Sequence, residues 1–318
     1  MQEKRPHYFV KSQGKVLTPV QMPDGTREYR VSGGNMRVFS VWPGIDLIYQ
    51  NFSVKECECS LEVSGEFLGI SYCHMGQEEC EWVCGDHLYL GAGDLSITRM
   101  ENRQPPFYFP EERYQGIVLM LDLGILREIP LPILGEYPLS LADKFCKGRH
   151  FFAMRANSHI VHIFSELYEI PEDVRDEYCK IKTLELLMFL YLTDPAKERQ
   201  LDKITKEQIN IVKAVRERLC EDLSQDPTIE QLAREFCVSP TALKANFKLI
   251  YRSSLKEYLR RKRMEHAAQL LRTEHIPVSE IARQVGYASQ SKFSAAFKTA
   301  FGSSPMEYRK KCVHDRNI

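Results

Sequence analysis

Two groups of polar and cationic side chains, fifty residues apart, have the chemistry needed to read a nucleic acid. The first group contains Thr241, Lys244 and Lys248, and the second contains Gln290, Ser291, Lys292, Ser294 and Lys298. Hydroxyl and amide groups can hydrogen-bond to base edges, and ammonium groups bind phosphates. The spacing within each group predicts one exposed helix face, so each group is a candidate reading surface.

The chain around these groups repeats itself. FKLIYRSSLKEY occupies 247–258, and FKTAFGSSPMEY occupies 297–308. Extended backward, each copy describes a short helix, a tight turn and a longer helix, which is the helix-turn-helix pattern. In each copy, two apolar residues four positions apart predict that one face of the longer helix is buried. These pairs are Leu243 with Phe247 and Phe293 with Phe297.

Local signals place both motifs in an all-helical segment. Ser239 followed by Pro240 is typical of a helix start, and Gly286 suits the positive φ of a tight turn. The helices that we expect span 206–223, 228–236, 240–250, 254–273, 278–285 and 289–301, with a short one after Pro305. The helix over 254–273 would separate the motifs by about 30 Å, close to the ~34 Å turn of B-DNA.

The charge of this segment favours a polyanionic partner. Residues 205–318 carry 21 Lys and Arg against 13 Asp and Glu, a net charge of +8, whereas residues 1–204 carry −8. A run of four cations lies on the spacer helix: Arg260, Arg261, Lys262 and Arg263. Two interpretations of this run stay open, because it could contact phosphates or form a solvated face.

The C-terminal hundred residues resemble the DNA-binding domain of the AraC/XylS family of bacterial transcription regulators. IARQVGYASQSKFSAAFKTAFGSSPMEYR (281–309) is similar to the family signature, and LAREFCVSPTALKANFK (232–248) is similar to its first helix-turn-helix. The resemblance implies that Ala245 and Ala295 face the bases together with the two groups above. The letters FSAAF also resemble the pyochelin-regulator-like subgroup, whose members respond to iron–siderophore complexes.

Four residues depart from the family pattern. Arginine is common where Ala245 and Ala295 stand, so we expect weaker base readout there or readout by neighbouring residues. Glycine is common where Cys237 and Arg252 stand, and arginine at a positive φ would restrict the backbone. The geometry of the turn after the first recognition helix is therefore an open question.

The first half of the chain has a different pattern. Residues 35–122 contain short alternating or apolar runs punctuated by Gly, Pro and Asp, which is typical of a small barrel or sandwich. We expect irregular structure over 125–150, helices over 155–170 and 172–193, and a polar linker over 194–207. The resemblance implies a cupin-like sensor barrel (1–150), a helical dimerisation hairpin (151–194), a linker (195–207) and an AraC-type DNA-binding domain (208–312).

The second of these helices has an apolar face with three- and four-residue spacing. Its residues are Ile181, Leu184, Leu187, Met188 and Tyr191. This face could pack on its own barrel or on a second copy of the chain. The family resemblance favours the second copy, so we expect a homodimer formed through these residues.

A metal site is a weaker interpretation of the first half. His74, Glu78 and Gly85 have the spacing of half a cupin metal motif, but Tyr72 stands where a second histidine is needed, and using His87 would require a different geometry. Five cysteines lie in the same region: Cys57, Cys59, Cys73, Cys80 and Cys84. Thiols suit soft metals or redox chemistry, whereas buried cysteine is commonly structural. We expect no metal and no cofactor, and keep metal or thiol-redox sensing as an alternative.

A small-molecule effector is the favoured ligand of this half. Aromatic side chains could line its pocket and arginines could anchor an acidic group. The candidates are Trp42, Tyr49, Tyr72, Trp82 and Tyr89, with Arg37, Arg99 and Arg103, although each is as readily a core or surface residue. We assign no ligand-binding residue.

The overall prediction is an α+β multidomain chain that regulates transcription by binding a specific promoter. The expected partners are double-stranded promoter DNA, RNA polymerase, a small-molecule effector and a second copy of the chain. No apolar run approaches eighteen residues and the N-terminus lacks a secretory h-region, so we expect a cytoplasmic protein. We expect no catalytic residue and no enzyme activity. The alternatives are a cupin-type enzyme with an accessory helical domain and a helical protein-interaction adaptor.

Overall fold

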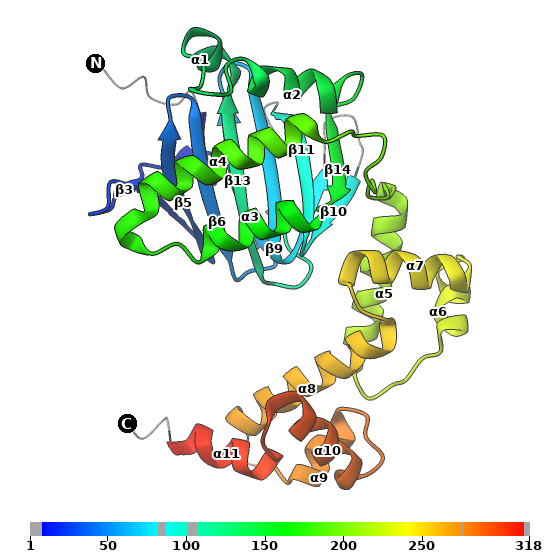
Figure 1. The fold of residues 1–318 in the computed structure, drawn as a ribbon. Coiled ribbons are helices and arrows are strands. Elements are labelled where there is room, and N and C mark those ends of the chain that lie inside the picture. The colour runs from blue at the N-terminus through cyan, green and yellow to red at the C-terminus, as the bar shows by residue number, and fades with distance from the viewer. Residues whose placement is uncertain (1–7, 82–86, 101–106, 275, 315–318) are drawn as a thin grey trace. The chain divides into compact units, whose positions relative to one another are not determined.

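The computed structural model describes residues 8–81, 87–100, 107–274 and 276–314. The chain divides into two compact units, Met1–Ile204 and Thr205–Ile318 (Figure 1). The first unit combines a large β-sheet with helices, and the described part of the second contains only helices. The coarse α+β prediction is therefore confirmed. No helix among the described residues combines the length and apolar character that crossing a membrane requires.

The main sheet of the first unit is antiparallel and follows the order β14-β11-β9-β13-β6-β5-β4-β3. Its strands are β3 (Val20–Gln21), β4 (Arg27–Val31), β5 (Gly34–Trp42), β6 (Ile45–Phe52), β9 (Phe67–Glu81), β11 (Asp94–Met100), β13 (Tyr114–Asp122) and β14 (Phe151–Arg155). A smaller sheet has the order β2-β1-β8 and contains β1 (Tyr8–Ser12), β2 (Lys15–Val16) and β8 (Cys59–Val63). Among the described strands these pairings do not close into a barrel.

Strand β9 passes from the main sheet into a second layer at Gly76. Its first half lies between β11 and β13, and its second half pairs with β10 (His87–Gly91) and β12 (Phe107–Tyr108), which also pairs with β7 (Glu56–Cys57). Gly76 has φ +78°, and an added Cβ would lie 1.8 Å from the carbonyl oxygen of Arg113, so only glycine fits this bend.

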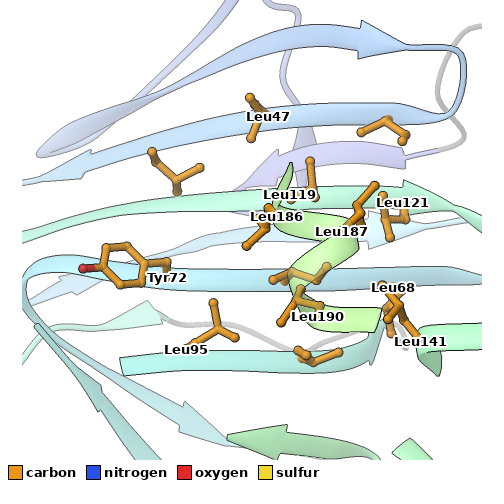
Figure 2. Packing of buried hydrophobic residues seen from close by; sticks show 14 of the residues in the cluster. Leu47, Leu68, Tyr72, Leu95, Leu119, Leu121, Leu141, Leu186, Leu187 and Leu190 are labelled. Carbon is orange, nitrogen blue, oxygen red and sulfur yellow. The ribbon is translucent and has the colours of Figure 1, made fainter. Parts of the chain in front are cut away.

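Alternating side chains bury both faces of the main sheet. On β13, Ile117 and Leu119 belong to a core beneath the helices, whereas Val118 and Met120 belong to a core shared with β1, β8, β10 and β12. The helices are α1 (Leu123–Glu128), α2 (Tyr137–Cys146), α3 (Ser158–Tyr168) and α4 (Arg175–Leu192), with a 3-10 turn at Glu172–Val174. Figure 2 shows leucines of α2 and α4 packed on the strands.

Several sequence expectations for the first unit were wrong in detail. Residues 125–150 are not irregular, because α2 forms there with Pro138 in its first turn, where proline is tolerated. The helix expected from residue 155 begins at Ser158, after β14, and Asn157 caps it by accepting a hydrogen bond from the Ile160 amide. Strands also precede residue 35.

The segment expected to be a linker is held against the first unit over part of its length. The amide of Leu201 donates to the Ala153 carbonyl at 3.0 Å, and that of Ile204 donates to the His87 carbonyl at 3.1 Å. Thr205 then caps helix α5, reciprocally with Gln208. The second unit therefore begins directly after a segment paired to the first.

The second unit contains seven described helices whose bounds confirm the expected ones within two residues, the short helix after Pro305 included. They are α5 (Lys206–Glu221), α6 (Ile229–Glu235), α7 (Pro240–Tyr251), α8 (Leu255–Thr273), α9 (Val278–Gln284), α10 (Gln290–Phe301) and α11 (Pro305–His314). Figure 1 shows α8 running between the pair α6–α7 and the pair α9–α10. These two pairs are the helix-turn-helix units.

Candidate nucleic-acid interface

The first helix-turn-helix, formed by α6 and α7 in the second unit, is the first candidate for reading DNA. Thr228 and Gln231 cap α6 reciprocally, and the Ser239 hydroxyl caps α7 by accepting from the Ala242 amide at 3.1 Å. Leu243 and Phe247 are buried, so α7 is fixed by one face. The other face exposes every predicted reading residue of this helix: Thr241, Lys244, Ala245 and Lys248.

The second helix-turn-helix, formed by α9 and α10, has the same construction. The Ser289 hydroxyl accepts from the Lys292 amide at 3.4 Å, and Phe293 and Phe297 are fully buried in the core that α10 shares with α8 and α9. The exposed residues are Gln290, Ser291, Lys292, Ala295 and Lys298, while Ser294 is half-buried. The structure thus places each predicted group on one accessible helix.

The turns of the two copies share an unusual backbone geometry. Cys237 and Gly286, between the paired helices, have φ +54° and +79°, and Arg252 and Gly302, after the reading helices, have φ +50° and +71°. The first copy therefore keeps the left-handed turns without glycine. This answers the open question about the turn after the first recognition helix. That turn keeps its left-handed geometry, and Arg252 adopts the strained positive φ.

We expect Cys237→Gly to stabilise the second unit by about 0.5–1 kcal/mol, because glycine adopts this φ without a Cβ clash. Cys237→Ala is the matched control, since it removes the thiol but keeps the clash. Thermal unfolding followed by circular dichroism checks the pair. Equal stability of the two variants would show that the turn is not strained.

The two helix-turn-helix units are joined by more than the spacer helix. Arg263 on α8 donates from Nε to the Leu223 carbonyl and from Nη2 to the Gln225 carbonyl, each at 2.8 Å, and its side chain is 11% exposed. Gly286 packs against the same segment, 223–225, and against Arg263. An added Cβ would lie 2.8 Å from the Ser224 carbonyl oxygen and 2.9 Å from Arg263 Nη2. We call Leu223, Ser224, Gln225, Arg263 and Gly286 the clamp.

The clamp assigns a structural role to one member of the cationic run, Arg263, and leaves both interpretations open for the others. Arg263 is structural, and Lys262 pairs with Glu265 at 2.8 Å. Arg261 lies 5.2 Å from the Tyr258 ring centroid and is within 3.9 Å of Glu265. Arg260 and Arg261 are both exposed. From the sequence, only Gly286 in the turn between α9 and α10 could be singled out. The sequence did not indicate which residues this glycine contacts.

Known proteins resemble this second unit. A helix-turn-helix domain model matches residues 232–311. The chain is 38% identical over 84 residues to the HTH-type transcriptional regulator AlkR of Acinetobacter baylyi, a match that covers 26% of this chain and 28% of AlkR. It is also 33% identical over 99 residues to the regulatory protein SoxS of Salmonella typhimurium, covering 31% of this chain and 92% of SoxS.

This chain belongs to the AraC/XylS family of transcriptional regulators. Its DNA-binding domain is the part that carries the likeness, and the matched region spans less than a third of AlkR. Among solved structures, the C-terminal domain of AraT from Geobacillus stearothermophilus is 41% identical, with 32% of this chain and 84% of that chain covered and a TM-score of 0.31. The matched helix-turn-helix domain lies in the second unit, so the first unit needs separate argument.

The residues that suggested a cupin-type metal motif in this AraC/XylS regulator are only partly described. The His74 ring lies 4.1 Å from the Tyr168 ring, and burial lowers the pKa of His74. Gly85 lies outside the described residues, as do Trp82, Cys84 and Arg103. Within the described part of the chain, no group of three His, Cys, Asp or Glu side chains is arranged to hold a metal ion.

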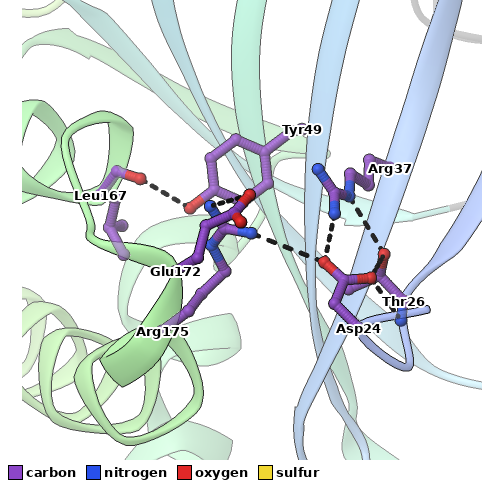
Figure 3. A network of polar contacts seen from close by, with 7 residues as sticks. All are labelled: Asp24, Thr26, Arg37, Tyr49, Leu167, Glu172 and Arg175. Atoms are coloured by element: carbon purple, nitrogen blue, oxygen red, sulfur yellow. Dashed lines mark hydrogen bonds and ion pairs between the residues drawn. The ribbon is translucent and has the colours of Figure 1, made fainter. Parts of the chain in front are cut away.

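Arg37 and Arg99, the two described arginines considered as ligand anchors, are engaged with carboxylates, and Figure 3 shows the contacts of Arg37. Arg37 pairs with Asp24 and donates from Nε to the Thr26 hydroxyl at 3.0 Å, while Arg175 of α4 reaches the same Asp24 oxygen at 3.5 Å. Partial burial opposes ionisation of Asp24, yet hydrogen bonds from Thr26 and the charge of Arg37 hold the pKa of its carboxyl below the ordinary value. Arg99 likewise donates to Asp143 at 2.5 Å.

Three of the four described aromatic candidates belong to one core, and the fourth lies elsewhere. Tyr72 stacks on Phe164 with centroids 4.3 Å apart, and Tyr49 donates to the Leu167 carbonyl, so both lie beneath the helices. Trp42 also packs against that core. Tyr89 is buried elsewhere and donates to Glu79 at 2.7 Å. Among the described candidates, Tyr89 is therefore separate from the other three.

The predicted dimerisation residues of α4 divide into two sets. Leu187 is 1% exposed and packs on its own sheet, with Leu184 and Tyr191 half-buried beside it. Ile181 and Met188, seven residues apart, are 60% and 36% exposed. The helix therefore uses most of its apolar face within its own unit and leaves a narrower stripe outside.

Proposed function

We propose that this AraC/XylS regulator binds promoter DNA by placing α7 and α10 in successive major-groove segments on one side of the duplex. The observation that carries the proposal is the clamp, which fixes two exposed reading helices at the two ends of α8. Its 19 residues give a separation of about 28 Å, close to the ~34 Å repeat of B-DNA. The proposed base-facing residues are Thr241, Lys244, Ala245, Lys248, Gln290, Ser291, Lys292, Ser294, Ala295 and Lys298.

Replacing a reading residue should change which bases are preferred. We expect Lys244→Ala and Gln290→Ala each to lose about 1–3 kcal/mol of discrimination at one position of the site, because each removes a side chain suited to a base contact. Selection from randomised duplexes, followed by sequencing, measures this preference. Lys197→Ala, a mostly exposed lysine of the first unit, is the control and should leave the preference unchanged. An unaltered preference in a variant would remove that residue from the interface.

We further propose that the first unit is a cupin-like sensor that binds a small-molecule effector. Three buried polar atoms beneath the helices, Trp42 Nε1, Tyr168 Oη and Thr183 Oγ1, have no hydrogen-bond partner among the described residues. A buried polar atom without a hydrogen bond lowers the stability of the fold. A polar ligand could supply the missing hydrogen bonds. Native mass spectrometry of protein purified from its own cells tests this; a retained small molecule supports the proposal, and only the bare chain mass would count against it.

The exposed stripe of α4 supports a homodimer. Ile181 and Met188 of α4 are seven residues apart, and Leu192 at the end of the helix is 70% exposed, whereas Val174, seven residues before Ile181, precedes the helix. Exposed apolar residues at this spacing on a helix are suited to pairing with the same helix of a second copy. We propose that Ile181 and Met188 form the contact, with Leu184 and Tyr191 at its edge and Leu187 supporting α4 from beneath.

Ile181→Glu should weaken this dimer at least about a hundredfold, because a symmetric contact loses two buried isoleucines, each worth roughly 1.5–3 kcal/mol. Sedimentation velocity over a concentration series measures the dissociation constant. Val16→Glu, an equally polarising change at an exposed residue of β2, is the control and should leave it unchanged. A dimer of undiminished affinity in Ile181→Glu would place the interface elsewhere.

A further inference from the structure

The first unit contains a pair of cysteines whose sulfur atoms are in contact. Cys57 and Cys59 are 3% and 0% exposed, and their Sγ atoms lie 3.1 Å apart. Glu58 between them is exposed, so the two thiols point to the same inner side of the chain. Both belong to the core formed with β1, β8, β10 and β12.

The backbone between these cysteines is interrupted. Cys57 ends β7 and pairs with Phe107 of β12, whereas Cys59 begins β8 and pairs with Ser12 of β1. Glu58 belongs to neither strand. A regular strand separates residues i and i+2 by about 6.6 Å, near the upper limit for a disulfide. Glu58 interrupts the regular strand between the two cysteines, and their sulfurs, 3.1 Å apart, need to move only about 1 Å closer to form a bond.

We propose that Cys57 and Cys59 form a reversible intrachain disulfide when the protein meets a hydroperoxide. Two thiols and one peroxide molecule give one disulfide and two molecules of water when the oxidant is hydrogen peroxide. The sulfurs supply the two electrons, and the peroxide O–O bond accepts them. The consequence for gene regulation rests on the proposed function, but the disulfide itself does not.

The chemistry proceeds in two displacements. The Cys57 thiolate attacks a peroxide oxygen, the O–O bond breaks, and the departing hydroxide takes a proton to become water. The Cys59 sulfur then attacks the sulfur of the Cys57 sulfenic acid, forming the S–S bond while the hydroxyl group leaves as the second water. The side-chain hydrogen bond between Cys57 and Cys59 lowers the pKa of Cys57, despite burial and the nearby charge of Glu58, and so favours the attacking thiolate.

Other cysteines of the unit have different surroundings. Cys73 Sγ lies 3.4 Å from the Gly76 carbonyl oxygen, and Cys146 Sγ lies 3.5 Å from that of Ile97. Burial raises the pKa of Cys146, which disfavours its thiolate. Cys146 is therefore a matched control, a buried thiol of the same unit without a sulfur neighbour at contact distance.

Closing the bond would act on two layers at once. β7 pairs with β12, and just before β7 the amide of Phe109 donates to the Lys55 carbonyl at 2.7 Å. β8 pairs with β1. A ring closed across a single intervening residue is strained, and strained disulfides are readily reduced. Oxidation would thus shift the small sheet against the β12 layer, and reduction would restore it.

The test treats the reduced full-length protein with hydrogen peroxide and measures intact mass and peptide connectivity. We expect a loss of about 2 Da and a peptide containing linked Cys57 and Cys59, reversed by a dithiol reductant. Cys57→Ser and Cys59→Ser should abolish the loss, and Cys146→Ala should retain it. Connectivity in the unaltered chain decides the matter even if a variant fails to fold: no mass loss, or a bond between other cysteines, overturns the proposal.

A second arm keeps this proposal separate from the DNA-binding one. The reduced and oxidised proteins are titrated against the same selected duplex. We expect at least about a threefold difference in affinity between the two forms, and its loss in Cys59→Ser. Equal affinities overturn the regulatory consequence while leaving the disulfide standing. Absence of specific binding in the reduced form contradicts the proposed function instead.

Discussion

Gly286→Ala should destabilise the α9–α10 unit by about 3 kcal/mol. Alanine at a φ of +79° costs roughly 1–2 kcal/mol, and its Cβ would also meet two backbone carbonyl oxygens, those of Ser224 and Leu223, within 3 Å. Those oxygens belong to the α5–α6 connection, which Arg263 holds in place. The clash therefore cannot be relieved by turning a flexible side chain and must displace one helix-turn-helix unit from the other.

Gly302→Ala separates the two causes. Gly302 has φ +71° but nothing lies within 4 Å of an added Cβ, so only the backbone strain applies, and we expect a loss of about 1 kcal/mol. Both tryptophans precede residue 205, so their fluorescence does not report on this unit. Hydrogen exchange of peptides from α9 and α10 measures the local unfolding free energy. Equal losses in the two variants would show that the clamp contributes nothing.

The helical half of the chain could be predicted from its sequence because its signals are local. Ser239 with Pro240 marked the start of α7, and Phe293 with Phe297 marked the buried face of α10; the structure bears out both. The reading faces followed, since a helix with one buried face must expose the other. What could not be predicted was the clamp, because Arg263 and Leu223 are forty residues apart and meet only in the folded unit.

The first unit was less predictable, because its elements depend on tertiary context. β14 is an apolar run, FFAMR, that reads equally well as the beginning of a helix until its pairing with β11 is known. The apolar face predicted for α4 was only partly right: Leu187 is buried and Ile181 is exposed, while the buried Leu186 and Leu190 were not part of the prediction. The spacing of His74 and Glu78 suggested half a metal motif, yet His74 packs on Tyr168.

A half-turn insertion in the DNA site should have the largest effect on binding. Five extra base pairs between the two segments rotate one of them by about half a turn, so only one reading helix can engage. Loss of one helix's base contacts should cost about 3–5 kcal/mol, or roughly a hundred- to a thousandfold in affinity. Ten extra base pairs restore the rotation but separate the segments by a further ~34 Å. Because α8 and the clamp cannot stretch, that site should remain weak as well.

The most direct measurement is therefore the affinity of the full-length protein for three duplexes: the selected site and the same site with five or ten base pairs inserted at its centre. A rigid two-helix reader predicts that both insertions weaken binding by at least about a hundredfold at one fixed salt concentration. Recovery with ten base pairs would reveal a flexible tether between the helices. Unchanged affinity for both inserted duplexes would contradict the account, because it would mean that the helices do not read one site together.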